Sequence, residues 1–155
     1  MAYCYGGPNN PYHNQGHLSI MKQMLAHLTL SNRQENLKLL REFIRKWAKS
    51  QRVSPSRRSN LELASEEIFR HLVTHAYRPG QPGSIAITLE EKGPRLRLTF
   101  EDDAAGRTCD SLNLPQAQNA PNSKGNCLNG VLQVAESIVY YRTADRKNRL
   151  VVYIS

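Results

Sequence analysis

The stretch SIAITLEEKGPRLRLTF, residues 84–100, decides the fold class of this chain. On both sides of Gly93-Pro94 its apolar residues alternate with polar ones, which is the pattern of two half-buried strands joined by a tight turn. Upstream of this stretch the apolar residues recur every three or four positions, as on the buried side of a helix. The change from the helical period to the strand period predicts an α+β fold with an antiparallel hairpin. The alternating residues are Ile85, Ile87, Leu89, Leu96, Leu98 and Phe100.

Two amphipathic helices are predicted upstream of this hairpin, after a short strand over Leu25–Leu30. A capping box formed by Ser31 and Gln34 starts the first helix, which ends near Ser50. Ser54 followed by Pro55 starts the second helix, which runs to about Tyr77. The apolar stripes are Leu37, Leu40, Ile44 and Trp47 in the first helix and Leu61, Ala64, Ile68, Leu72 and Ala76 in the second.

Downstream, residues 128–135 predict a third helix, and two strands follow over Ile138–Arg142 and Leu150–Ile154. The segment from Asp102 to Gly125 has almost no apolar period and is too long for a simple connector, which favours a lid or binding loop. We expect a two-layer α/β sandwich, with a mixed, mostly antiparallel sheet covered on one face by three helices. Residues 25–155 would form this domain, and residues 1–24 a poorly ordered extension.

The composition is that of an ordinary globular protein, with 155 residues of which 39% are hydrophobic and 22% charged. No apolar run is long enough to span a membrane, and the N-terminus lacks the pattern of a signal peptide. Three cysteines (Cys4, Cys109 and Cys127) without CxxC spacing argue against a disulfide framework or structural zinc. We therefore expect a cytoplasmic protein without contact to a membrane.

The net charge of +8 is concentrated in one stretch, because residues 33–58 contain nine Lys or Arg against two Glu. Five of these cations form a stripe on the first helix, namely Lys38, Arg41, Arg45, Lys49 and Arg52. Three interpretations remain open: a solvated helix face, a surface for an acidic protein, or a surface for nucleic acid. Nucleic acid is disfavoured, because the basic face has no aromatic side chains on which bases could stack.

The second helix carries a polar row along one edge of its buried stripe. At 100° per residue, Glu67, His71, Thr74 and His75 fall on this edge, whereas Glu62, Glu66 and Arg70 face solvent. A polar row that borders the core is typical of a cleft.

Three segments, in this order, resemble the histidine-kinase-like ATPase superfamily (GHKL, or Bergerat fold), and within it the anti-sigma-factor serine kinases. ELASEEIFRHLVTHAY (62–77) is similar to the N box, and LTFEDDAAGRTCDSL (98–112) to the D-D-G-x-P-F-D-P box. GNCLNGVLQVAESIVYYR (125–142) is similar to the glycine box and the strand after it. Upstream, LTLSNRQENLKLLREFIRKWA (28–48) resembles the opening strand and first helix, so the resemblance covers roughly residues 27–155.

The resemblance implies a site for ATP with Mg²⁺. In it Glu67 matches the catalytic carboxylate that activates the attacking hydroxyl, and Asp102 the aspartate that reads the adenine amino group. His71 stands at the Mg²⁺-binding position and His75 at the last polar position of the N box. Gly125 matches the first glycine of the glycine box, which closes over the phosphates.

Three positions depart from the family pattern. His71 replaces the asparagine that holds Mg²⁺, an ion that prefers oxygen ligands. Ala104 replaces the glycine after the aspartate pair, although Gly106 offers a substitute. Cys127 replaces the second glycine of the glycine box, where a Cβ costs about 1 kcal/mol if the backbone needs a positive φ. Together they indicate weak, metal-independent or absent nucleotide binding.

Each residue also has a purely structural interpretation. Glu67 could lie at the surface edge of its helix, and His71 could be a hydrogen-bonded histidine rather than a phosphate contact. Asp102 could initiate a turn, and Cys127 could be a small buried hydrophobe.

Two functions follow from the resemblance. The first is an anti-sigma-factor-like regulator that binds ATP, phosphorylates a serine of a STAS-domain antagonist and sequesters a sigma factor; the resemblance also allows a homodimer. The second is a catalytically degenerate member that binds its protein partner independently of nucleotide.

Overall fold

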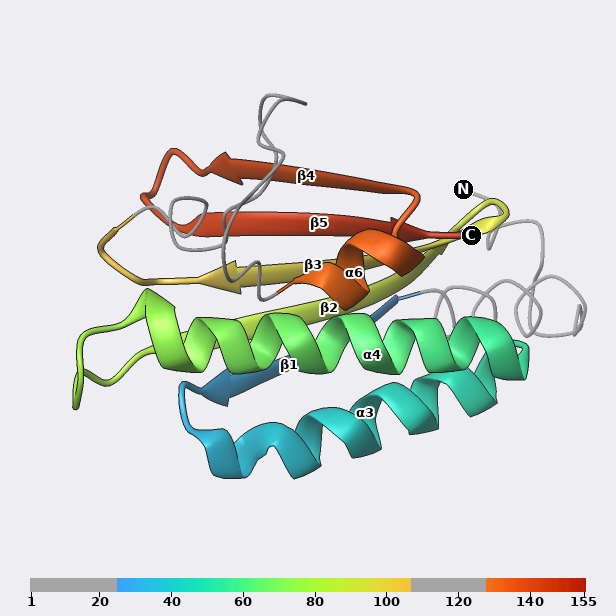
Figure 1. The fold of residues 1–155 in the computed structure, drawn as a ribbon, viewed down its shortest axis with the longest axis horizontal. Coiled ribbons are helices and arrows are strands. Elements are labelled where there is room, and N and C mark those ends of the chain that lie inside the picture. The colour runs from blue at the N-terminus through green and yellow to red at the C-terminus, as the bar shows by residue number, and fades with distance from the viewer. Residues whose placement is uncertain (1–24, 107–127) are drawn as a thin grey trace, which may run out of the picture.

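The computed structural model describes residues 25–106 and 128–155, and in them a five-stranded sheet forms one layer. Its strands stand in the order β1-β2-β3-β5-β4, and all neighbouring strands pair antiparallel (Figure 1). Their bounds are β1 Leu25–Ser31, β2 Ser84–Lys92, β3 Arg95–Asp102, β4 Ser137–Arg142 and β5 Asn148–Ile154. The predicted α+β architecture is confirmed.

In the described part of the chain, helices cover one face of this sheet (Figure 1). They are α3 (Leu37–Ser50), α4 (Pro55–His71) and the short α6 (Asn129–Val134). A 3-10 turn, η1 (Gln34–Asn36), precedes α3, and a π-helical turn, η2 (Leu72–Ala76), continues α4 almost to the predicted end of that helix. None of the helices in the described part of the chain is long and apolar enough to cross a membrane.

The core lies between the two layers and follows from the alternation of the strands. Every second residue of β3, from Leu96 to Asp102, is buried against the helices. The predicted apolar stripes of α3 and α4 are buried with it, except that Ala76 is only half-buried. Asp102 therefore continues an otherwise apolar series and points into the helix-covered side of the sheet. The buried strand residues include Ile85, Ile87, Leu89, Leu98, Phe100, Leu150, Val152 and Ile154.

The predicted turn of the central hairpin is confirmed at Gly93-Pro94. Gly93 has φ +61°, the left-handed backbone that a type II′ turn requires at its first loop residue. Pro94 at the second position has a ring-fixed negative φ, which fits the same turn. This two-residue turn places Lys92 opposite Arg95 and so fixes the register of β2 against β3.

The predicted capping box at the start of the first helix is wrong. Ser31 is the last residue of β1, where it pairs with Ser84, and α3 begins only at Leu37. Asn36 stabilises the link instead, because its Nδ2 donates to the carbonyl and hydroxyl oxygens of Ser31 at 3.0 and 2.8 Å. The start of the second helix is as predicted, with extended Ser54 as N-cap and Pro55 in the first turn.

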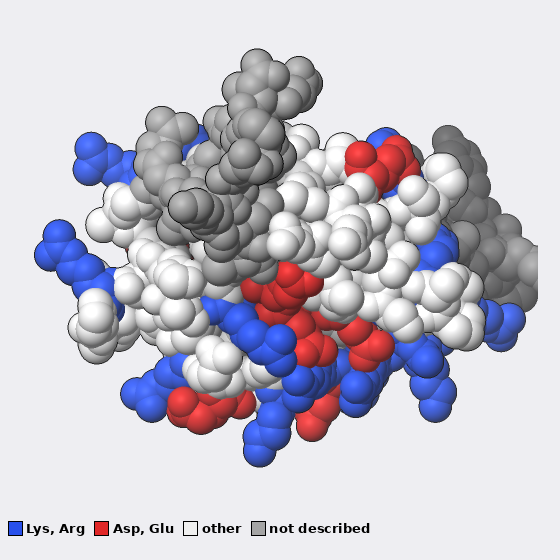
Figure 2. Space-filling model, in the orientation of Figure 1, with Lys and Arg blue, Asp and Glu red and all other residues white. Residues whose placement is uncertain are grey.

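The predicted solvent orientation of Glu62 and Glu66 is also wrong. Glu66 accepts a hydrogen bond from Arg41 at 2.8 Å, and Glu62 one from Arg45 at 2.6 Å. Each glutamate side chain is only 19% exposed. Figure 2 shows acidic side chains gathered among Lys and Arg on the helical face of the molecule. Two of the five cations in the predicted basic stripe are therefore neutralised within the protein.

Candidate functional site

Asp102 is a buried carboxylate at the end of β3, with 2% of its surface exposed. Its Oδ1 accepts two hydrogen bonds, from the Ala104 N–H at 3.0 Å and from the Asn148 side-chain amide at 2.9 Å. Burial of a carboxylate is costly unless such donors compensate it. The carboxylate thereby has a fixed orientation at the edge of the core.

Asn148 holds together the chain that leaves β3. Its Nδ2 also donates to the carbonyl oxygens of Ala104 at 3.2 Å and Gly106 at 2.8 Å. Its Oδ1 accepts from the Tyr140 hydroxyl at 2.7 Å and from Arg142 at 2.9 Å. The sequence places Asn148 in a polar turn, and only its position opposite Asp102 in the β3–β5 pairing gives it this role.

Ala104 and Gly106, predicted as cofactor-binding positions, lie in this network through their backbone. Ala104 is buried, and Gly106 is exposed with its carbonyl oxygen also accepting from Arg142 at 3.1 Å. A Cβ added at Gly106 would meet no atom within 4 Å. The predicted residues Gly125 and Cys127, and most of the predicted lid, lie outside the described residues.

The neighbouring carboxylate, Asp103, connects β3 to the end of the α4 segment. Its Oδ1 accepts from the Tyr77 hydroxyl at 2.7 Å and from the Ser84 N–H at 2.9 Å. Burial of the Tyr77 ring and its bond to Asp103 raise the pKa of the Tyr77 phenol well above its usual range. Tyr77 is therefore a neutral donor that fixes Asp103.

Glu67 lies half-buried on α4 and contacts α6. Its Oε1 accepts a hydrogen bond from the backbone N–H of Gly130 at 3.3 Å. A Cβ at Gly130 would stand 1.8 Å from Glu67 Oε2, so the absence of a side chain there permits the contact. Desolvation raises the pKa of the Glu67 carboxyl, and the bond from Gly130 opposes this shift. The predicted base serves here as a cap on the first turn of α6.

His71 and His75 differ in exposure, although both belong to the predicted polar row. His71 is buried, whereas His75 and Thr74 are exposed, so the row does not border the core over its whole length. The two imidazole rings lie 4.6 Å apart between centroids. The described residues contain no group of three His, Cys, Asp or Glu that could hold a metal ion. Mg²⁺ prefers oxygen ligands, and the imidazole nitrogen of His71 at the predicted Mg²⁺ position is a poor replacement for one. These residues therefore do not fit Mg²⁺.

Among the described residues, the structure brings Glu67, His71 and Asp102 to the boundary between the helices and the sheet. Asp102 faces the helices, and α4, which carries Glu67 and His71, packs on β3 and β5. The end of the α4 segment reaches the end of β3 through the bond between Tyr77 and Asp103. Glu67 and Asp102 are thus on the same side of the sheet, as an adenosine-sized site between these elements requires.

The model of one protein family, the histidine kinase-like ATPase domain, matches residues 30–154. The chain belongs to the histidine kinase-like ATPase family. This match spans all three segments of the predicted site and agrees with the observed two-layer fold. No curated protein matches the chain significantly. In this family context, the Asp102 network is the best-formed part of the predicted nucleotide site among the described residues.

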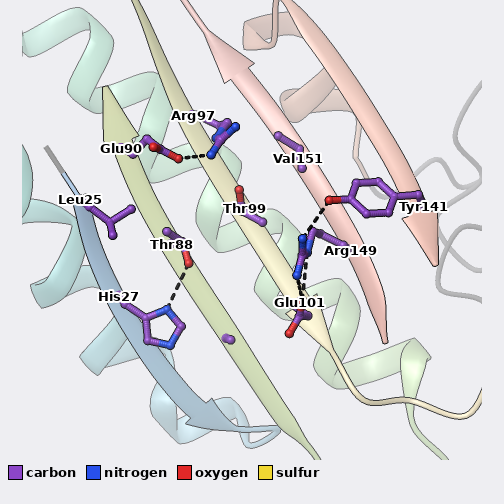
Figure 3. Close-up of a pocket in the computed structure, with 11 residues that line it drawn as sticks. Leu25, His27, Thr88, Glu90, Arg97, Thr99, Glu101, Tyr141, Arg149 and Val151 are labelled. Carbon is purple, nitrogen blue, oxygen red and sulfur yellow. Dashed lines mark hydrogen bonds and ion pairs between the residues drawn. The ribbon is translucent and has the colours of Figure 1, made fainter. Parts of the chain in front are cut away.

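A separate groove of about 440 Å³ lies on the face of the sheet that the helices leave uncovered (Figure 3). Its walls carry two ion pairs, between Arg97 and Glu90 and between Arg149 and Glu101. Arg149 also donates to the Tyr141 hydroxyl at 2.9 Å. The charges of this groove are paired within the face itself, and none of the predicted site residues lines it.

Proposed function

We propose that this histidine kinase-like ATPase domain is an ATP-binding regulatory protein of the anti-sigma type. Asp102 would read the adenine amino group, and the protein would bind a sigma factor or a STAS-domain antagonist. The observation that carries the nucleotide part is the buried Asp102 carboxylate, oriented by the Ala104 N–H and the Asn148 amide. A fixed, desolvated acceptor discriminates strongly between ligands with and without a matching N–H donor.

Phosphoryl transfer is not well supported by the same residues. A general base must reach the hydroxyl that it deprotonates, and Glu67 is bonded to Gly130 instead. The residue at the predicted metal position is the buried His71, whose imidazole does not suit Mg²⁺. We therefore infer that nucleotide serves as a regulatory ligand and that kinase activity is weak.

The Glu67–Gly130 contact also favours a second candidate, a regulator that has lost nucleotide binding altogether. This protein would bind its partner through the same fold, and ATP would not change the affinity. In that case Glu67→Ala would leave regulation unchanged.

Calorimetric titration with ATP and with ITP tests the first candidate. The two nucleotides differ at position 6 of the purine, where adenine carries an amino group and hypoxanthine an oxo group. We expect saturable ATP binding, at least tenfold weaker ITP binding, and little dependence on Mg²⁺. Asp102→Asn should reduce the preference for ATP to about twofold or less, because a neutral amide oxygen is a weaker acceptor.

Asp145→Asn is the matched control, since Asp145 is an exposed carboxylate in the β4–β5 turn. It should leave both affinities unchanged. Absence of saturable binding at millimolar ATP would refute the nucleotide site and leave the nucleotide-independent regulator. Partner binding is tested by titrating candidate sigma factors and STAS proteins with and without ATP, and sedimentation tests the homodimer.

A further inference from the structure

A second groove, of about 600 Å³, lies between the β1–α3 link and the segment that joins α4 to β2. Ser31, Asn32 and Arg33 form one wall, and residues from Val73 to Pro82 form the other. Its volume is in the range of sites that bind small ligands or peptide segments. It is separate from the open sheet face and has no residue in common with it.

Three hydrogen bonds join the two walls. The Asn32 N–H donates to the Gly83 carbonyl at 3.1 Å, and the Gly83 N–H donates back to Asn32 Oδ1 at 2.8 Å. Asn32 Nδ2 donates to the Gln81 carbonyl at 2.9 Å. The far wall is a tight turn in which Gly80 has φ +77° and the Gln81 N–H donates to the Arg78 carbonyl at 3.0 Å. The groove is therefore preformed.

The charge of this groove is positive and largely uncompensated. Its lining includes Arg33 and Arg78 and no Asp or Glu. Among the described residues Arg78 forms no ion pair, and Arg33 has only Glu35, at 3.9 Å with both side chains more than 70% exposed. Such a solvated pair contributes little. This differs from α3 and the open sheet face, where carboxylates neutralise the arginines that line the surface.

Apolar groups complete the groove. Val73, Pro79, Pro82 and the ring of Tyr77 lie in the lining beside the two arginines. A ligand that suits both features carries carboxylates next to an aliphatic or proline side chain. Guanidinium groups bind carboxylates through two parallel N–H···O bonds, and the apolar lining favours an acidic peptide over a simple anion.

We propose that this groove binds an acidic segment of a partner protein. The inference deepens the proposed function, because it assigns the partner of that regulator a chemistry and a docking position. The position is next to the predicted nucleotide site, since Tyr77 lines the groove and also donates to Asp103, the neighbour of Asp102. Val73 and Thr74 come from the π-helical turn that begins directly after His71.

The test uses the full chain and a fluorescein-labelled peptide, GELEPELEG, with GKLKPKLKG as the opposite-charge control. Fluorescence anisotropy at about 20 mM salt measures affinity, because screening there is weak. Amide NMR shifts locate the site. We expect saturable binding of the acidic peptide only, with the largest shifts at residues 31–34 and 73–82.

Arg33→Gln with Arg78→Gln should weaken peptide binding at least tenfold. Both side chains are exposed, so the fold should be retained, which the NMR spectrum also reports. Lys46→Gln with Lys49→Gln, which removes two exposed cations of α3, is the charge-matched control and should change the affinity less than twofold. Largest shifts on α3, equal loss in this control variant, or tighter binding of a random 16-base-pair DNA duplex to the same amides would each overturn the proposal.

The two proposals fail independently. Loss of ATP binding with intact peptide binding would refute the nucleotide site and leave the acidic-segment groove. Intact ATP binding without any saturable peptide binding would refute the groove alone.

Discussion

The contact between Glu67 and Gly130 predicts a measurable coupling between α4 and α6. Gly130 is the second residue of α6, and its φ is not in the left-handed region, so alanine fits its backbone. Alanine in a helix is favoured over glycine by about 0.5–1 kcal/mol. In Gly130→Ala, however, the new Cβ would stand 1.8 Å from Glu67 Oε2 and displace the carboxylate. The propensity gain is therefore opposed by loss of the capping hydrogen bond.

The magnitude follows from the geometry of that bond. At 3.3 Å and half-buried, a backbone-to-carboxylate bond contributes about 0.5–1.5 kcal/mol. Gly130→Ala in the wild-type background should therefore be neutral or destabilising by up to about 1 kcal/mol. In the Glu67→Ala background the same change should be about 1 kcal/mol more favourable than in the wild-type background, because no carboxylate is left to displace. The expected coupling energy is about 1 kcal/mol.

Urea unfolding of the four proteins of this double-mutant cycle measures the coupling. The new Cβ would also stand 2.7 Å from Leu63 Cδ2, but this contact is common to both backgrounds and cancels in the cycle. Additivity of the two changes to within about 0.3 kcal/mol would refute the interpretation of Glu67 as a cap on α6. It would return Glu67 to the role of an available base.

The pH dependence of stability gives a separate readout of the burial of Glu67. Because desolvation raises the pKa of Glu67 above its unfolded value, the folded state binds the proton more tightly. The corresponding stability is fully present below the unfolded pKa of about 4.3 and is lost as pH rises through the folded pKa. Glu67→Gln keeps an acceptor for Gly130 and should remove this part of the pH dependence.

Three further predictions concern the end of β3. Gly83→Ala would place a Cβ 2.0 Å from the Tyr77 ring and should lower the free energy of unfolding by about 1–3 kcal/mol, measured by thermal unfolding. Gly80→Ala meets no atom, but its φ of +77° strains alanine and should cost about 1 kcal/mol. Because the pKa of the Tyr77 phenol is raised in the folded state, the wild-type protein loses stability as pH rises above about 10, the phenol's pKa in the unfolded chain. Tyr77→Phe should remove this loss. Urea unfolding of both proteins at pH 8 and at pH 11 measures it. Asn148→Ala should destabilise by about 1–3 kcal/mol in chemical unfolding, because it removes a donor from the buried Asp102 carboxylate, and an effect below about 0.5 kcal/mol would contradict the network described above.

The central hairpin could be predicted because β2 and β3 each bury one face, so that their apolar residues alternate with polar ones in the sequence. The start of α3 could not. Ser31 and Gln34 form a local helix-start pattern, but Ser31 pairs with Ser84 of β2, which is 53 residues away in the sequence and therefore absent from that pattern. Long-range strand pairing overrides a local capping preference.

The candidate site was predictable in its carboxylates and not in the groups that hold them. Asp102 is predicted from the resemblance of LTFEDDAAGRTCDSL to a family motif, but Asn148 acquires its role only from the register of β3 against β5. Similarly, helical periodicity places Glu66 away from the core, and only the packing of α3 against α4 puts Arg41 beside it. Which residues share a face is local information, whereas which residues meet across elements depends on the whole fold.

The two carboxylates of the predicted site are held in ways that suit different tasks. Asp102 is almost fully buried and bonded to donors on β5 and on the backbone just after β3, so its position is set by the sheet itself. Glu67 is half-buried and bonded to one N–H of a six-residue helix, so a modest local movement of α6 would release it. Under the proposed function, recognition of a purine would therefore depend on a carboxylate fixed by the sheet, while the carboxylate proposed for chemistry would depend on the position of α6. Under the proposed function, this arrangement favours nucleotide-dependent regulation over turnover. The ATP–ITP comparison tests the role of Asp102, and the Glu67–Gly130 cycle tests whether Glu67 is held by α6.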